Sequence, residues 1–313
     1  MGISEDNIIE IDRSHLADYS GETCILPMQG WFGHIKGIDI YPLPDSIIPV
    51  YIGYHSVDKL HYTDGALTTL REHMPICCRD EATRDLMTSY GIEAYLTGCM
   101  TVTLPTREIQ NGTTVFLVDA PDGIEEYIPE SLRSSIEYIT QEVPYKCTDS
   151  ASEIRRLDRM ASNLLERYRT EAALVVTSRL HCAAPCLGMG IPVILARKYF
   201  DERYGWIEKY LSLYTPDHFS EIDWFPQVPD LSNIKPHLIK LACSVLRGEP
   251  ATQDMTVINE FYEQRDKFQL NTPVYVKAYH YLHGRFPRLA DFLRERLLQR
   301  FTVASGRNKT SGV

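Results

Sequence analysis

The sequence predicts an α/β fold built from two doubly wound domains. Three observations lead to this prediction. The chain has 313 residues, which at about 150 residues per domain suggests two domains. Short apolar runs alternate along it with segments of helical period, as in parallel strands joined by helices. The composition, with 44% hydrophobic and 24% charged residues, is that of a globular protein and excludes disordered, collagenous and coiled-coil chains.

The first domain is expected over residues 1–108. Polar or glycine turns separate its apolar runs, as they separate strands. Ala82, Leu86 and Met87 recur at helical spacing, and Gly91 follows them at the position where a glycine commonly ends a helix. The pattern predicts a helix over 81–90, a linker over 104–112, and strands over 24–29, 48–53, 74–78 and 93–96.

The second domain is expected over residues 109–248 and contains the clearest helix of the chain, over 151–168. A capping box, Ser150-Ala151-Ser152-Glu153, opens this helix, and an apolar stripe from Ile154 to Tyr168 follows at three- and four-residue spacing. The remaining pattern predicts helices over 131–140 and 181–188, and strands over 114–118, 143–147, 172–177 and 192–195.

Residues 249–313 are expected to form a helical tail. Its strongest helical pattern covers 288–301, and the last dozen residues are small and polar, which predicts disorder at that end. The tail therefore lies outside both predicted domains.

The charge balance limits the partners of the protein. A net charge of -10 and a pI near 5.5 exclude a nucleic acid or an anionic membrane as the main partner, because both require a basic surface. No run approaches the roughly 20 apolar residues that cross a bilayer, and the N-terminus lacks a signal peptide. The eight cysteines are irregularly spaced, as buried free thiols in a reducing compartment are. We therefore expect a cytoplasmic protein without an integral membrane segment, at most associated with the inner face of the membrane.

Arginines follow two predicted strands at the points where helices begin. Arg79 follows the strand over 74–78, and Arg179 follows the strand over 172–177. Ligands of open α/β sheets bind beyond the carboxyl ends of the strands. One arginine from each domain across a cleft suits a small, multiply charged anion, because guanidinium groups bind phosphate and carboxylate bidentately. The alternative is that each arginine pairs with a neighbouring carboxylate.

The sequence does not predict a metal site. His181, Cys182 and Cys186 are close together, but the two cysteines share a helix face with small and apolar neighbours. A fourth ligand at the spacing of a structural zinc site is absent.

Two pairs of segments resemble the hallmark motifs of the polysaccharide pyruvyl transferase family. The first pair is ICCRDEAT at 76–83 with GIEAYLTGCMTVTL at 91–104. The second pair is SRLHCAAP at 178–185 with LGMGIPV at 187–193. The segment GWFGH at 30–34 is similar to a further element found in part of the family, so the resemblance extends over roughly residues 5–235.

The resemblance implies a GT-B-like arrangement of two Rossmann-like domains and a ketal-forming transferase. Such enzymes move the enolpyruvyl unit of phosphoenolpyruvate onto two hydroxyls of a sugar in a cell-surface or lipid-linked polysaccharide, and release phosphate. Phosphoenolpyruvate is then a co-substrate and no cofactor is implied. By position, the residues placed around the donor are Arg79, Ser178, Arg179, Leu180 and His181.

This chemistry needs a general acid that protonates the enol carbon, and His181 is the candidate. Its alternative roles are phosphate binding and ring packing. On the acceptor side, Trp31 could stack on a sugar ring. Candidate bases for the sugar hydroxyl are His34, His55 and Asp119, with none favoured over the others.

The sequence departs from the family at its start. Family members usually begin with a strand and a glycine loop of the pattern Asn-x-Gly-Asp, and no such segment precedes Cys24. We therefore expect the first domain to lack its first βα unit, on the acceptor side.

Two other functions are compatible with the predicted fold. A nucleotide-sugar glycosyltransferase would need an acidic residue for the ribose, for which Asp149 or Glu202 is available. A non-catalytic glycan-binding or assembly protein is the second alternative, and the presence of Arg79, Arg179 and His181 argues against it.

Overall fold

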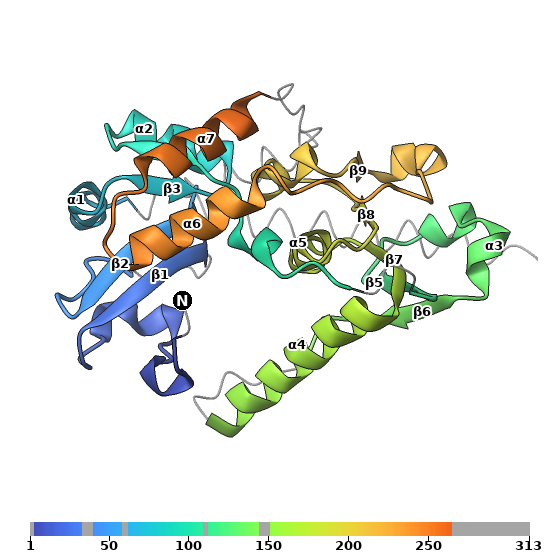
Figure 1. Cartoon of the computed structure of the whole chain (residues 1–313), viewed down its shortest axis with the longest axis horizontal. Coiled ribbons are helices and arrows are strands. Elements are labelled where there is room, and N and C mark those ends of the chain that lie inside the picture. The colour runs from blue at the N-terminus through green and yellow to red at the C-terminus, as the bar shows by residue number, and fades with distance from the viewer. Residues whose placement is uncertain (1–2, 33–39, 58–61, 109–111, 144–150, 265–313) are drawn as a thin grey trace, which may run out of the picture.

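The computed structural model describes residues 3–32, 40–57, 62–108, 112–143 and 151–264. Two parallel sheets, each covered by helices, lie side by side in this part of the chain, which confirms the predicted α/β class with two Rossmann-like halves (Figure 1). The predicted helix over 288–301, the disordered end, His34, Ser150 and most of the strand over 143–147 lie outside the described residues.

The sheet of the first half adds its strands in chain order, β1-β2-β3-β4, and all three pairs are parallel. Helix α1 (Asp64–Glu72), which the apolar pattern did not predict, begins at Thr63, whose side chain accepts a hydrogen bond from the backbone N–H of Ala66. Helix α2 (Glu81–Ser89) matches the prediction. The strands are β1 (Cys24–Trp31), β2 (Ile47–His55), β3 (Ile76–Cys78) and β4 (Ala94–Leu96).

The sheet of the second half has the order β6-β5-β7-β8-β9 and is also parallel. Its order reverses between β5 and β7, so the carboxyl ends of these two strands form the switch point at which doubly wound sheets bind ligands. The first sheet shows no such reversal among its described strands. The strands are β5 (Thr114–Val118), β6 (Ile136–Ile139), β7 (Ala172–Thr177), β8 (Val193–Ala196) and β9 (Leu213–Tyr214).

The predicted helix over 131–140 is wrong. The chain forms only one helical turn, α3 (Glu130–Arg133), and then the strand β6, which pairs with β5 from Ile136 to Ile139. β6 is an edge strand with half-buried side chains, so its alternation of apolar and polar residues is weak. Pairing with a buried neighbouring strand decided its conformation, which local spacing does not encode.

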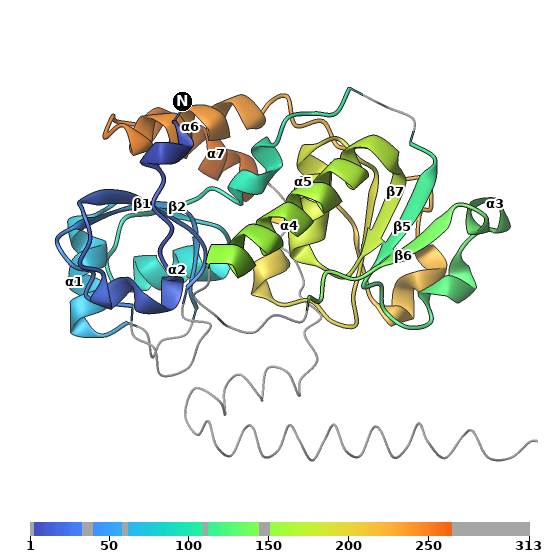
Figure 2. The same ribbon diagram turned by 90° about the horizontal axis from the view of Figure 1, so that it is seen from below.

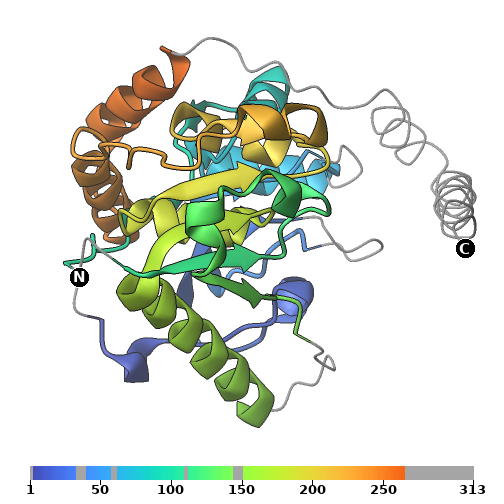
Figure 3. The same cartoon turned by 90° about the vertical axis from the view of Figure 1, so that its right-hand side faces the viewer.

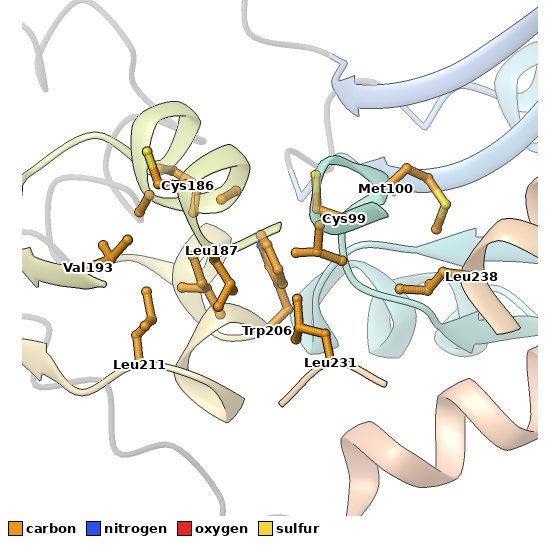
Figure 4. Close-up of a cluster of buried hydrophobic side chains, with 14 of the residues drawn as sticks. Cys99, Met100, Cys186, Leu187, Val193, Trp206, Leu211, Leu231 and Leu238 are labelled. Atoms are coloured by element: carbon orange, nitrogen blue, oxygen red, sulfur yellow. The ribbon is translucent and has the colours of Figure 1, made fainter. Parts of the chain in front are cut away.

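Helices α4 (Ala151–Glu171) and α5 (Leu180–Gly188) cover the second sheet as predicted. α5 packs tightly against the 3-10 helix η4 (Met100–Thr103), because a Cβ at Gly188 would stand 2.7 Å from the carbonyl oxygen of Thr101. The two halves thus share one hydrophobic core, to which side chains of η4 and of the second half, including α5, contribute (Figure 4). Labelled there are Cys99, Met100, Cys186, Leu187, Val193, Trp206, Leu211, Leu231 and Leu238.

The last described helices return to the first half. α6 (Lys235–Leu246) and α7 (Thr252–Glu263) follow the second sheet in the chain but lie over the first (Figures 1 and 3). Asn259 of α7 accepts a hydrogen bond from the backbone N–H of Leu96 at 2.7 Å. Gly98 has a φ of +67°, and a Cβ there would collide with the hydroxyl of Tyr262. None of the helices in the described part of the chain combines the length and apolarity needed to span a bilayer.

Candidate active site

Arg79 stands at the carboxyl end of β3 and is 2% exposed. Its backbone N–H donates to the carbonyl oxygen of Tyr54, which fixes its position beside β2. Within the described residues its Nε has no hydrogen-bond partner, and the nearest carboxylate oxygen, Oδ2 of Asp80, is 4.0 Å away. Burial lowers the pKa of Arg79, although Asp80 opposes this effect. A buried guanidinium with an unsatisfied donor is costly, and it indicates an anionic ligand at this position.

Asp80, the residue after Arg79, is buried together with His55. Asp80 is the N-cap of α2 and accepts hydrogen bonds from the backbone N–H and the hydroxyl of Thr83 at 3.0 and 2.9 Å. Its other oxygen, Oδ2, is 2.5 Å from Nδ1 of His55. Burial alone would raise the pKa of Asp80, but the charges and hydrogen bonds of His55, Arg79 and Thr83 outweigh it and lower the pKa. The Asp80 carboxylate therefore caps α2, binds the His55 ring and is the negative charge beside Arg79.

Arg203 approaches from the second half. It lies in the 3-10 helix η6 (Glu202–Tyr204), and Asp201 binds its guanidinium bidentately at 2.8 and 2.6 Å. The guanidinium lies over the ring of Trp31, at the end of β1, with 4.6 Å to the centroid. Trp31 in turn contacts His55 edge-on, with 6.1 Å between the ring centroids. Arg203 therefore connects the second half to the carboxyl end of the first sheet.

His181 lies in the first turn of α5, between these arginines. Its side chain is accessible, yet desolvation and the positive charges of Arg79, Arg203 and Arg13 lower its pKa below the usual value of about 6.5. Arg13 comes from the 3-10 helix η2 (Arg13–Asp18) and donates to the carbonyl oxygen of Trp31 at 2.7 Å. Cations from both halves thus act on one imidazole, which is neutral at pH 7 in the free protein.

Arg179 has a different environment from Arg79. It is 35% exposed, its Nε donates to Oδ2 of Asp119 at 3.0 Å, and its Nη2 donates to Oε1 of Glu142 at 2.5 Å. Partial burial lowers the pKa of Arg179, but the two carboxylates outweigh this effect and raise it. For Arg179 the structure shows the pairing with neighbouring carboxylates that the sequence left open.

The neighbours of Arg179 build the switch point between β5 and β7. Asp119 has a φ of +46°, an uncommon conformation for a residue other than glycine. The hydroxyl of Ser178 donates to the carbonyl oxygen of Asp119, and the backbone N–H of Gln141 donates to its carboxylate at 2.9 Å. The side chain of Leu180 is buried in the core. Ser178, Leu180 and Asp119 are therefore engaged within the second half.

Part of the chain is similar to a known protein family. Residues 64–196 match the sequence profile of the family described as polysaccharide pyruvyl transferase. Over this segment the chain is similar to the polysaccharide pyruvyl transferase family, which is a family of enzymes. The match confirms the resemblance carried by the two pairs of motifs. No curated protein matches the chain.

The matched segment supplies only part of the candidate site. It contains Arg79, Asp80 and His181, whereas Arg203 follows it and Trp31 precedes it. Arg13 and His55, like Trp31, come from the part of the chain before residue 64. Sequence reasoning missed Arg13 and Arg203, because neither stands at the junction of a predicted strand and helix.

A cavity of about 670 Å³ is lined in part by His181. It lies between α4, α5, η4 and the segment after β6. Its described lining is mostly apolar and consists of Thr101, Leu104, Thr140, Gln141, Val143, Leu157, Met160, Ala161, Leu164, Leu165, Tyr168, His181 and Pro185. His181 therefore lines an apolar cavity and is also influenced by the charges of Arg79, Arg203 and Arg13.

Metal ligands do not cluster in the described part of the chain, which contains no group of three or more His, Cys, Asp or Glu side chains able to hold an ion. Cys182 and Cys186 are buried within α5 as free thiols. The site thus offers arginines and histidines as its ligand-binding groups.

Proposed function

We propose that the protein transfers the pyruvyl group of phosphoenolpyruvate to two hydroxyls of a sugar in a cell-surface or lipid-linked polysaccharide, as a ketal, and releases phosphate. One observation carries this proposal: Arg79 is buried, its Nε has no hydrogen-bond partner among the described residues, and its charge acts together with that of Arg203 on His181. Phosphoenolpyruvate carries a phosphate and a carboxylate, and guanidinium groups bind both bidentately.

Arg79 and Arg203 hold the donor from opposite sides in this proposal. Burial holds the side chain of Arg79 in place, and the hydrogen bond from its backbone N–H to Tyr54 fixes its main chain. The position of Arg203 is set by the bidentate contact with Asp201 and by the Trp31 ring. Arg179, which is neutralised by Asp119 and Glu142, acts as a positioning residue for the first turn of α5 and so for His181.

His181 supplies the proton for the enol carbon. The positive charges of the arginines lower the pKa of His181, and the negative charges of the bound donor offset them. The imidazole therefore gains a proton when the donor binds. The imidazolium then protonates C3, the C2–C3 double bond becomes single, and a sugar hydroxyl adds to C2 as its proton passes to a base. The second hydroxyl replaces phosphate at C2, forming the second C–O bond as the C2–O bond to phosphate breaks, and its proton returns to the neutral imidazole of His181. His55 is the favoured base among the described candidates, because Asp119 is already paired with Arg179.

The donor can be identified by thermal unfolding of the protein with phosphoenolpyruvate, UDP-glucose or UDP-galactose. A donor at 100 times its Kd should stabilise the fold by about 2.7 kcal/mol. We expect the midpoint to rise with phosphoenolpyruvate, and to rise by clearly less at the same concentration in the Arg79→Gln variant. A rise with a UDP-sugar alone would contradict the proposal and favour the glycosyltransferase alternative. A glycan array treated with the protein and phosphoenolpyruvate would then identify the acceptor.

We place this reaction in the cytoplasm, at most at the inner face of the membrane, where a lipid-linked acceptor would be accessible. The described cysteines are all free thiols, as expected in a reducing compartment. Fractionation of the producing cells, with the protein followed by antibody, tests this placement. Recovery outside the cytoplasm and the inner membrane face would contradict it.

A further inference from the structure

Helix α4 extends beyond the sheet that it covers. Its 21 residues give a length of about 31 Å, whereas the six residues of β7, which follow it directly, extend about 20 Å. The beginning of the helix therefore projects past the carboxyl edge of the second sheet, toward the first half (Figures 1 and 2). The apolar stripe of the helix continues along this projection, where no strand of the described sheet lies beneath it.

The stripe faces the cavity beside His181. From α4 the cavity is lined by Leu157, Met160, Ala161, Leu164, Leu165 and Tyr168, and from α5 by His181 and Pro185. Met160 is 42% exposed, although such a side chain gains free energy when it is covered. Among the described lining residues, only His181 can carry a charge near neutral pH.

We propose that this cavity binds the hydrocarbon part of an amphiphilic acceptor, a sugar linked to an alkyl or isoprenoid chain. The inference rests on the proposed function, because it takes His181 as the acid beside the carbon to which the acceptor sugar adds. In that function the donor is held by the arginines that act on His181, whereas the cavity that His181 also lines is mostly apolar and suits a part of the second substrate.

The chemistry of the lining favours a hydrocarbon over a second sugar or an anion. Sugars and anions are held by charged and amide side chains, and Gln141 is the single amide among the described lining residues. Its side chain is already 3.4 Å from the hydroxyl of Tyr168. The volume of about 670 Å³ lies within the 300–1,000 Å³ typical of small-molecule sites with apolar walls. Such a site would select acceptors by the chain next to the sugar.

The test compares hexyl and methyl glycosides of the same sugar. Calorimetric titrations of β-D-glucopyranosides and β-D-galactopyranosides into the protein saturated with phosphoenolpyruvate measure both affinities for each sugar. We expect the hexyl glycoside of at least one sugar to bind ten-fold or more tightly than its methyl counterpart. Equal affinities for both pairs, or no binding of any of the four, would overturn the inference. The thermal shift with phosphoenolpyruvate is measured separately. A normal shift without a preference for hexyl would contradict the cavity assignment alone, whereas the absence of a shift would contradict the proposed function.

Three variants of α4 locate the effect. Ala161→Trp adds bulk within the cavity and should remove the preference for hexyl, with the affinity for phosphoenolpyruvate unchanged. Ser162→Trp adds the same bulk at an exposed position outside the lining and should keep the preference. Met160→Glu alters a side chain that is already partly exposed, so the fold is retained, and it should weaken hexyl binding alone. If the hexyl preference survives both Ala161→Trp and Met160→Glu, the hexyl group binds outside this cavity and the assignment is wrong.

Discussion

Arg79 and Arg179 occupy equivalent places in the two halves but differ in what surrounds them. Each follows a buried strand and precedes the helix that returns over the sheet. Arg79 is buried, with one donor unsatisfied, whereas Arg179 is partly exposed and paired with two carboxylates. The position of an arginine at a strand end therefore does not make it a ligand. The partners that other segments bring to it decide whether its charge is available to a substrate.

The difference between the two arginines also assigns them different roles, with Arg79 binding the donor and Arg179 positioning α5. Asp80, beneath Arg79, is already engaged by His55 and Thr83, so it leaves the Nε of Arg79 unsatisfied. The carboxylate of Asp119, in contrast, accepts directly from Arg179 and connects it to the segment after β6. The first half thus presents a charge, and the second half presents the imidazole of His181 on a fixed helix. Four predictions test this division, from the largest effect to the smallest.

His181→Gln should have the largest effect. It removes the proton donor and keeps a polar side chain, so kcat should fall about 10²- to 10⁴-fold. The affinity for phosphoenolpyruvate should stay within about threefold, because the arginines provide the binding. Single-turnover kinetics and calorimetry measure the two quantities. If affinity collapses together with kcat, His181 is a ligand of the donor and not its acid.

The two arginines should respond unequally to the same substitution. Arg79→Ala should weaken phosphoenolpyruvate binding roughly 10- to 150-fold, which corresponds to the loss of about 1.5–3 kcal/mol in a charge-assisted contact. Arg179→Ala should weaken it less than about threefold, because its charge is already neutralised. Calorimetry on both variants, with Arg79→Lys as a control that keeps the charge without the fork, gives the comparison. Equal losses of affinity in the two alanine variants would contradict the predicted difference between the arginines.

Donor binding should be linked to proton uptake at pH 7. Because the pKa of His181 is lowered in the free protein, its imidazole starts neutral and gains a proton beside the anionic donor. The affinity should therefore fall as the pH rises from the pKa of His181 in the free protein to its higher pKa in the complex, by up to about tenfold per unit, and become constant above that. Titrations in buffers of different ionisation enthalpy measure the uptake, and His181→Gln should abolish it. Uptake that persists in this variant must come from another group.

Trp31→Leu should have the smallest effect. It removes the surface on which Arg203 lies, so phosphoenolpyruvate binding should weaken about two- to fivefold, as for a cation–π contact of about 0.5–1 kcal/mol. The same substitution made in an Arg203→Ala background should change the affinity little. A full effect in that background would show that Trp31 acts on the donor without Arg203.

Local patterns were sufficient where one segment determines its own structure. The strand over 114–118 and the helix at 81 were predicted at their observed starts, because a buried strand is continuously apolar and Asp80 is a good N-cap. The segment 131–140 was not, because its strand depends on pairing with β5. Arg203 was missed for the same reason, since its role depends on Trp31, which is 172 positions earlier in the chain.

By itself, the sequence determined the α/β class, the family motifs and the presence of Arg79, Arg179 and His181 at helix starts. These features follow from apolar periodicity, capping and residue type, which act within a few neighbouring positions. Only the tertiary structure decided that Arg79 is buried with a free donor, that Arg179 is neutralised, and that Arg203 and Arg13 complete the site. Charge and burial depend on contacts between distant segments, so the availability of a cation is determined by the packing of the two halves.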